Sequence, residues 1–168
     1  IAKVVINEID YDQASTDAAE FIEILNADTI SVDLGELSLV LVNGNNDSVY
    51  KTINLPSVML APGAYFVVCG DSTNVDNCDL DVTPNPNLIQ NGPPDAFALF
   101  SGATLLDTVS YEGSVAAPYT ETDGSGLSDS GSAAYLGISR SPDGNDTDVN
   151  NVDFSRRCVT PGTANTLD

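Results

Sequence analysis

Short apolar segments recur along this chain, and residues that favour turns separate them. Nowhere do apolar residues keep the i, i+3, i+4, i+7 spacing of an amphipathic helix over three turns. We therefore predict strands at residues 4–9, 20–25, 37–42, 49–53, 65–69, 96–100, 105–111 and 135–140. Seven or eight short strands with frequent turns are typical of an all-β sandwich, whose core lies between the inward faces of two sheets.

Two long segments interrupt this pattern. Residues 79–94 contain four prolines, and residues 112–134 are rich in Gly and Ser. Loops longer than about 15 residues are uncommon in compact domains and are usually functional or mobile. We therefore predict a sandwich with two long acidic or Gly/Ser-rich loops. The 168 residues fit a single domain, residues 1–168.

The charge of the chain excludes several function classes. It carries 25 Asp and Glu against 5 Lys and Arg, so its formal net charge is −20, and it has no His. Proteins bind phosphate backbones through Lys and Arg, so direct binding to nucleic acid or to an anionic membrane is not expected. No apolar run approaches the roughly 18 residues of a membrane helix. Without His, the chain alone cannot build a Ser-His-Asp or Cys-His mechanism.

The three cysteines suggest an oxidising compartment. Cys69 ends an apolar segment, and Cys78 follows it after a polar loop. We predict a disulfide between them, which would stabilise so short a loop by about 2–3 kcal/mol. The alternative is two reduced thiols in a cytosolic protein. Cys158, after two arginines, is the odd cysteine; it is buried, free or paired outside this chain.

An acidic cluster near the start of the chain is the sharpest candidate site. Alternating carboxylates on a strand share one face, and crowded carboxylates repel one another, which a hard cation relieves. Calcium accepts six to eight oxygen ligands in flexible geometry. We therefore predict a calcium site, and the alternative is a solvated acidic edge. The predicted ligands are Glu8, Asp10, Asp12, Asp17 and Glu20.

Two other candidate sites are weaker. Residues 143–150 alternate Asp and Asn, but position 151 is Asn and position 157 is Arg, so this is not an EF-hand loop. A network of turns capped by Asp and Asn side chains is the favoured interpretation. A paired-carboxylate glycosidase is disfavoured, because the chain has no Trp to stack sugars and no motif combining nucleophile, base and orienting residue.

Several stretches, taken in order, resemble bacterial lamin-tail domains. They are residues 6–12, 16–24, 32–41, 60–68, 139–148 and 160–165. The resemblance implies an immunoglobulin-like β-sandwich that is secreted or surface-attached and acts as an accessory module in a multidomain protein. Residues 89–96 and 109–113 resemble the version attached to secreted nucleases. Because the chain starts at Ile1, without an initiator Met or a signal peptide, we expect it to be a piece of a longer secreted protein.

We therefore expect a non-catalytic extracellular module, not an enzyme, that positions or anchors a neighbouring domain, such as a nuclease. The alternative is a calcium-dependent adhesion or carbohydrate-binding module. Expected partners are the neighbouring domain, a surface protein or a glycan. The net charge argues against close self-association, so a monomer is expected.

Overall fold

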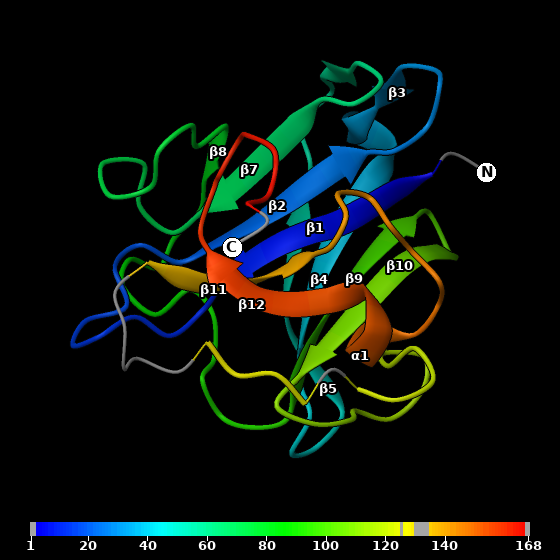
Figure 1. Ribbon diagram of the computed structural model, residues 1–168. Helices are drawn as coiled ribbons and strands as arrows, with labels where there is room; N and C mark the ends of the chain where they lie inside the picture. Colours follow the sequence, from blue (N-terminus) through cyan, green and yellow to red (C-terminus); the bar gives the residue numbers. More distant parts are fainter. Residues whose placement is uncertain (1–2, 125, 130–134, 167–168) are drawn as a thin grey trace.

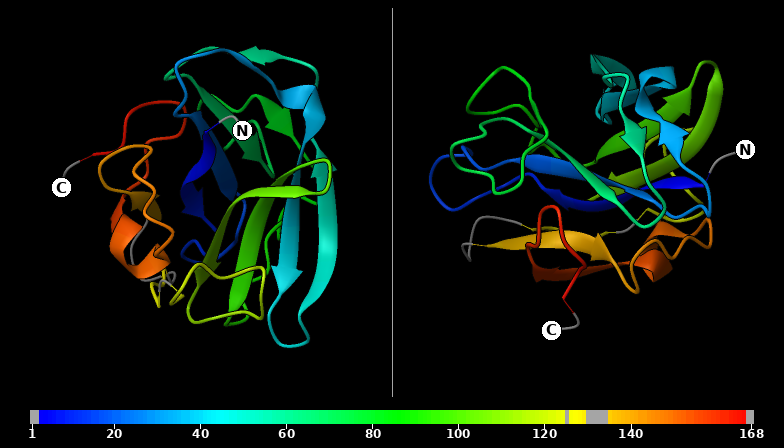
Figure 2. Two further views of the ribbon diagram at one scale, coloured as in Figure 1. Left: turned by 90° about the vertical axis from the view of Figure 1, so that its right-hand side faces the viewer. Right: turned by 90° about the horizontal axis from the view of Figure 1, so that it is seen from above.

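The computed structural model describes residues 3–124, 126–129 and 135–166. Two β-sheets pack face to face (Figures 1 and 2). The larger sheet contains, in spatial order, β12 (Phe154–Cys158), β11 (Leu136–Arg140), β1 (Val4–Asp10), β2 (Phe21–Asn26), β7 (Tyr65–Cys69) and β8 (Leu80–Asp81). The smaller sheet contains β10 (Thr104–Tyr111), β9 (Asp95–Ser101), β4 (Leu37–Asn43) and β5 (Ser48–Asn54). Neighbouring strands are antiparallel except β7 and β8, which are parallel.

The expected immunoglobulin-like sandwich is thus confirmed, and each predicted strand is present with small shifts at its ends. The smaller elements were not predicted. They are β3 (Val32–Asp33), the 3-10 helix η1 (Leu34–Glu36), β6 (Met59–Leu60), β8 and α1 (Asn150–Asp153). Strand β12 was also missed, because its sequence Phe-Ser-Arg-Arg-Cys has few apolar residues and its pairing with β11 defines it. Within the described residues, no helix has the length and hydrophobicity needed to cross a membrane.

The core lies between the two sheets and is built from alternating residues of the facing strands. Tyr11 and Tyr111 meet there, with ring centroids 4.1 Å apart. Fully buried aliphatic and aromatic side chains from both sheets surround this pair. The larger sheet contributes Ile6, Ile9, Ile22 and Ile24, and the smaller sheet contributes Leu39, Leu41, Phe97, Leu99 and Val109. Burying side chains of this size contributes roughly 1.5–3 kcal/mol each.

Two β-bulges create a polar contact between the sheets. The register of β1 on β2 shifts between Ile6 and Glu8, and that of β10 on β9 shifts between Leu105 and Asp107. A bulge disrupts the ladder locally and redirects side chains. The N–H of Ile6 donates to the Asp107 carboxylate across the sandwich. The bulges thus bring a carboxylate of β10 to the backbone of β1.

The outer face of the larger sheet is also covered. Every residue of β1 and β2 is buried, because loops lie over both strands. One is the C-terminal segment 159–166, which crosses the front of the sheet in Figure 1 and donates backbone hydrogen bonds to Glu8 and Glu23. Another is the loop between β7 and β8. The predicted disulfide between Cys69 and Cys78 is confirmed and closes that loop, while Cys158 is free and exposed.

Candidate functional site

A buried arginine forms the centre of the most concentrated polar site. Arg140 ends β11 and points between the sheets, where its side chain is fully buried over the ring of Phe154. Its Nη2 donates to Asp107 at 2.7 Å, and its Nη1 lies 3.2 Å from Asp153 and 3.5 Å from Asp146. Its Nε donates to the carbonyl of Ile6 at 2.9 Å. A buried guanidinium needs this number of acceptors to offset its lost hydration.

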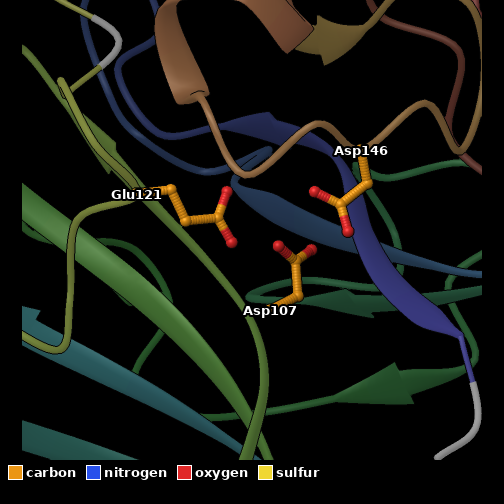
Figure 3. Close-up of side chains that lie close together, drawn as sticks. All are labelled: Asp107, Glu121 and Asp146. Carbon is orange, nitrogen blue, oxygen red and sulfur yellow. The ribbon is translucent and has the colours of Figure 1, made fainter.

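Three acidic side chains from separate parts of the chain converge beside this arginine. Asp107 comes from β10, Glu121 from the segment that follows it, and Asp146 from the segment between β11 and α1 (Figure 3). One carboxylate oxygen from each lies within 4.8 Å of the others. Oxygens at this spacing can hold a metal ion or share a proton.

Asn150 joins this cluster to the edge of the smaller sheet. Its Oδ1 accepts from the N–H of Ser110 at 3.1 Å, and its Nδ2 donates to the carbonyl of Thr108 at 2.9 Å and to Glu121 at 2.7 Å. Glu121 in turn accepts from the N–H of Thr108 at 3.3 Å. These side chains bond edge groups of β10 that have no neighbouring strand, which protects the edge from pairing with another chain.

The cluster contains more acid than base. Asp107, Glu121, Asp146 and Asp153 surround the single guanidinium of Arg140. Burial and then the nearby Asp107 charge raise the pKa of Glu121 to about 9. Burial also raises the pKa of Asp107, although the charge of Arg140 opposes that shift. Glu121 therefore keeps its proton at neutral pH, which reduces the surplus of negative charge beside Arg140.

The predicted calcium ligands lie elsewhere and do not share one face, because Glu8 accepts from the C-terminal segment on the outer face of the larger sheet whereas Glu20 accepts from Leu88 and Ile89 of the core. Glu8 and Asp10 are in β1, which ends before Asp12, so only the first two share the strand. Glu8 is fully buried, Glu20 is 1% exposed and Asp10 is 3% exposed. A solvated acidic edge is therefore wrong for these three side chains. Among the described residues, the three oxygens within 4.8 Å are those of Asp107, Glu121 and Asp146 instead.

Backbone and side-chain donors occupy most of the predicted ligands. Glu8 accepts from the N–H of Thr160, and Glu20 accepts from the N–H groups of Leu88 and Ile89. Asp17 accepts from the N–H of Gln13, whose Nε2 donates to Asp10. Burial is the largest cause that raises the pKa of Glu8 and of Glu20 to about 8 and that of Asp10 to about 7. Calcium binding by these five residues stays a prediction.

Sequence reasoning found only one member of the buried cluster. Asp146 lies in the alternating Asp and Asn stretch 143–150, whereas Asp107, Glu121 and Arg140 were not singled out. A signal was present, because Asp107 interrupts an apolar strand and Arg140 ends another. Charged residues are almost never fully buried unless paired, so a charge within a core strand indicates a buried partner. Their convergence depends on the two bulges, which no local pattern indicated.

A sequence model of the lamin tail domain matches residues 1–113, which is more than half of the chain. The chain belongs to the lamin tail domain family. Members of this family are generally non-catalytic, immunoglobulin-like modules. No curated protein matches the chain at a significant level. Asp107 lies within the matched range, while Glu121, Arg140 and Asp146 lie beyond it.

Proposed function

We propose that this lamin tail domain is a non-catalytic extracellular module that positions or anchors a neighbouring domain, such as a nuclease. The observation that carries the proposal is the family match combined with an all-β sandwich. The disulfide between Cys69 and Cys78 supports an oxidising, extracellular setting. The resemblance of residues 89–96 and 109–113 to nuclease-linked versions supports the choice of neighbour.

The use of the buried carboxylates supports a structural module over an enzyme. Asp107, Glu8 and Glu20 each accept from a backbone N–H of another segment. Asp153 likewise accepts from the N–H of Thr147 and from Arg140. Side chains occupied in this way hold segments onto the sheets. A general acid or base must instead lie within hydrogen-bonding reach of a substrate.

The proposal is tested on the parent protein and on the isolated chain. Deleting residues 1–168 from the parent should leave the turnover of the neighbouring domain intact while releasing that domain from its surface or partner. The isolated chain should not cleave nucleic acids or glycosides. Turnover by the isolated chain, abolished by substitution of its buried acids without unfolding, would overturn the non-catalytic role. Unchanged localisation after the deletion would overturn the anchoring role.

A second candidate function is a calcium-dependent adhesion or carbohydrate-binding module. Its specific support is the surplus of carboxylate at Asp107, Glu121 and Asp146, whose oxygens lie within 4.8 Å of one another. Calcium ligands lie 2.3–2.6 Å from the ion, so opposite ligands are about 5 Å apart. The ion would take the place of the proton on Glu121. Against it, Arg140 already neutralises part of this charge.

Thermal unfolding with calcium, with magnesium and with a chelator tests this second function. Calcium at about 100 times its Kd should stabilise the fold by about 2.7 kcal/mol. Glu121→Gln should abolish the calcium effect, and Asp10→Asn should abolish it instead if the ion binds at the predicted ligands around Asp10. An unchanged melting temperature in calcium would remove calcium from both places.

A further inference from the structure

A cavity of about 420 Å³ opens on the outer face of the larger sheet, away from the Arg140 cluster. Ligand pockets commonly have volumes of roughly 300–1,000 Å³, so this one suits a small group. Phe21 of β2 and Asp10 of β1 are directly paired across the two strands and both line it. Other residues that line it include Gln13, Val75, Asp76, Tyr135, Val159 and Pro161.

Each wall of the cavity is fastened to the sandwich by its own contacts. Gln13 holds the segment between β1 and β2, since its Nε2 donates to Asp10 and its Oε1 accepts from the N–H of Ala19. The disulfide holds the loop that carries Asn74, Val75 and Asp76. The C-terminal segment is held where the N–H of Gly162 donates to Glu23 at 2.7 Å and where the Asn77 side chain donates to the carbonyl of Pro161. The cavity is therefore largely pre-formed.

The cavity combines apolar walls with two carboxyl groups, those of Asp10 and Asp76. Phe21, Val75 and Val159 supply apolar surface. Asp10 accepts from Gln13 through Oδ1, and its carboxyl group also shares a hydrogen bond with the side chain of Asp129. Asp76 is exposed, and its carboxylate accepts no hydrogen bond from the described residues. None of the described lining residues is Lys or Arg, so the charged groups that the cavity offers are acidic hydrogen-bond acceptors.

A further acidic group lies behind Asp10. Asp129 is 1% exposed, and its Oδ2 accepts from the N–H of Tyr11 at 2.7 Å. No N–H or hydroxyl group of the described residues donates to its Oδ1, and its side chain shares a hydrogen bond with that of Asp10. Two carboxyl groups can hydrogen-bond to each other only when one of them is protonated, so this pair holds a proton that a cation can replace. None of the described residues that line the cavity is a basic partner for this pair.

Tyr135 stands at this cavity with an exposed side chain. It is 76% exposed and has a φ of 74°, a backbone conformation that is uncommon for a bulky residue. Its carbonyl accepts from the N–H of Val159, which lines the same cavity, so its backbone position is fixed there. An exposed aromatic ring beside carboxylates attracts cations through its electron-rich face.

We propose that this cavity binds a lysine or arginine side chain of a partner protein, with the aliphatic stem against Phe21 and Val75 and the cationic end at Asp10. Long basic side chains have an apolar stem and a charged end, which matches the apolar walls and the carboxyl groups of Asp10 and Asp76. The net charge of −20 favours a basic partner over an acidic one. This inference rests on the proposed anchoring function, because it names the chemistry of the anchored partner.

The test measures binding of a fluorescein-labelled Gly-Arg-Gly-Lys-Gly peptide by fluorescence anisotropy. Near-physiological salt, about 150 mM, screens long-range attraction, and EDTA removes competing divalent cations. Asp10→Asn should weaken binding by at least about tenfold, because a charge-assisted hydrogen bond is lost. Asp76→Asn should weaken it about threefold, as expected for an exposed ion pair. Tyr135→Asn, which tolerates a positive φ, should also weaken it about threefold.

Two controls separate a site from general attraction to an acidic protein. Asp123→Asn removes the same single charge from an exposed residue that does not line the cavity, and it should change the Kd by less than about 1.5-fold. A peptide with citrulline for Arg and acetyl-lysine for Lys keeps the shape without the charge and should not bind. Equal losses in Asp76→Asn and Asp123→Asn, or binding of the uncharged peptide, would overturn the proposal.

Failure here is distinguishable from failure of the anchoring function. Asp76→Asn is an exposed substitution that keeps the fold testable even if Asp10→Asn unfolds the chain. If no peptide binds while deletion of the module still releases the neighbouring domain, the cavity inference is wrong and the anchoring proposal stands. If the peptide binds through the cavity but the deletion releases nothing, the cavity inference stands and the anchoring proposal is wrong.

Discussion

Acidic side chains occur in two contrasting settings in this protein. Between the sheets, the carboxylates of Asp107 and Asp153 accept hydrogen bonds from Arg140 and from backbone N–H groups. At the outer cavity, Asp10 accepts from Gln13 and shares a hydrogen bond with Asp129, and the carboxylate of Asp76 accepts no hydrogen bond from the described residues. The first setting fastens the fold together, whereas the second leaves acceptors for a cation from outside. The same residue type therefore serves stability in one place and recognition in the other.

Removing the buried guanidinium should give the largest effect. Arg140→Met leaves Asp107 and its neighbours buried without a counter-charge, so we expect the free energy of unfolding to fall by about 3–5 kcal/mol. Urea denaturation followed by circular dichroism measures it. Arg156→Met removes an exposed arginine from the adjacent strand and should change the free energy by less than about 0.5 kcal/mol. Equal effects of the two substitutions would refute the role given to the buried cluster.

The pH dependence of stability should run opposite to that of proteins with salt-bridged acids. Burial raises the pKa of Glu121 to about 9 and that of Glu8 to about 8, above the value of about 4.3 in an unfolded chain. Between these values the folded state binds more protons, so stability is full below about pH 4 and falls as the pH rises to about 8–9. A tenfold change in proton affinity corresponds to about 1.4 kcal/mol, so we expect the free energy of unfolding to fall by a few kcal/mol. Urea midpoints at pH 5 and pH 8.5 test the sign.

Glu121→Gln assigns part of that dependence to the buried cluster. Glu121 and Asp107 share a hydrogen bond, which the neutral amide can also donate, so the variant should lose less stability than the parent between pH 5 and pH 8.5. Asp123→Asn, with no buried contact, should keep the full dependence. If the free energy of unfolding changes equally with pH in the parent chain and in both variants, the titrating groups lie outside the cluster.

Breaking the disulfide should affect the outer cavity more than the inner cluster. Replacing Cys69 and Cys78 together by Ala frees the loop that forms one wall of the cavity. We expect about 2–3 kcal/mol of lost stability from the increased freedom of the unfolded chain. Peptide binding should also weaken, while the pH dependence assigned to Glu121 should persist. Cys158→Ala, at an exposed free thiol, should change neither property.

The sequence predicted the sandwich well, because alternation and turn residues are local signals. Leu37–Asn43 and Asp95–Ser101 are apolar strands that any strand pattern finds. Spacing also sufficed for Cys69 and Cys78, which are joined through a short loop. The inner cluster was not predictable in this way. Asp107 and Arg140 lie 33 positions apart, and they meet only after two sheets have packed with a bulge in each.

The outer cavity shows the same limit. Asp10 lies in β1, Asp76 lies in the loop between β7 and β8, and no local sequence pattern indicates that they come together. Nor does any local pattern indicate that Tyr135 lies beside them. The acidic stretch around Asp10 was nevertheless recognised as unusual. Its residues were expected at one solvated or metal-bound face, whereas the C-terminal segment and the segment at 88–89 bury Glu8 and Glu20. Long-range covering segments, rather than local pattern, separate these carboxylates into different environments.

The smallest expected effect is the most direct check on the contrast between the two settings. Asp76→Asn should change the free energy of unfolding by less than about 0.5 kcal/mol, because this carboxylate is exposed and accepts no hydrogen bond from the described residues. Any change should be stabilising, since it removes one charge from a chain of net charge −20. Urea denaturation beside Asp123→Asn measures it. A decrease of more than about 1 kcal/mol in the free energy of unfolding would mean that the Asp76 carboxylate stabilises its loop, as that of Asp107 stabilises β1. Its oxygens would then not be available to a partner.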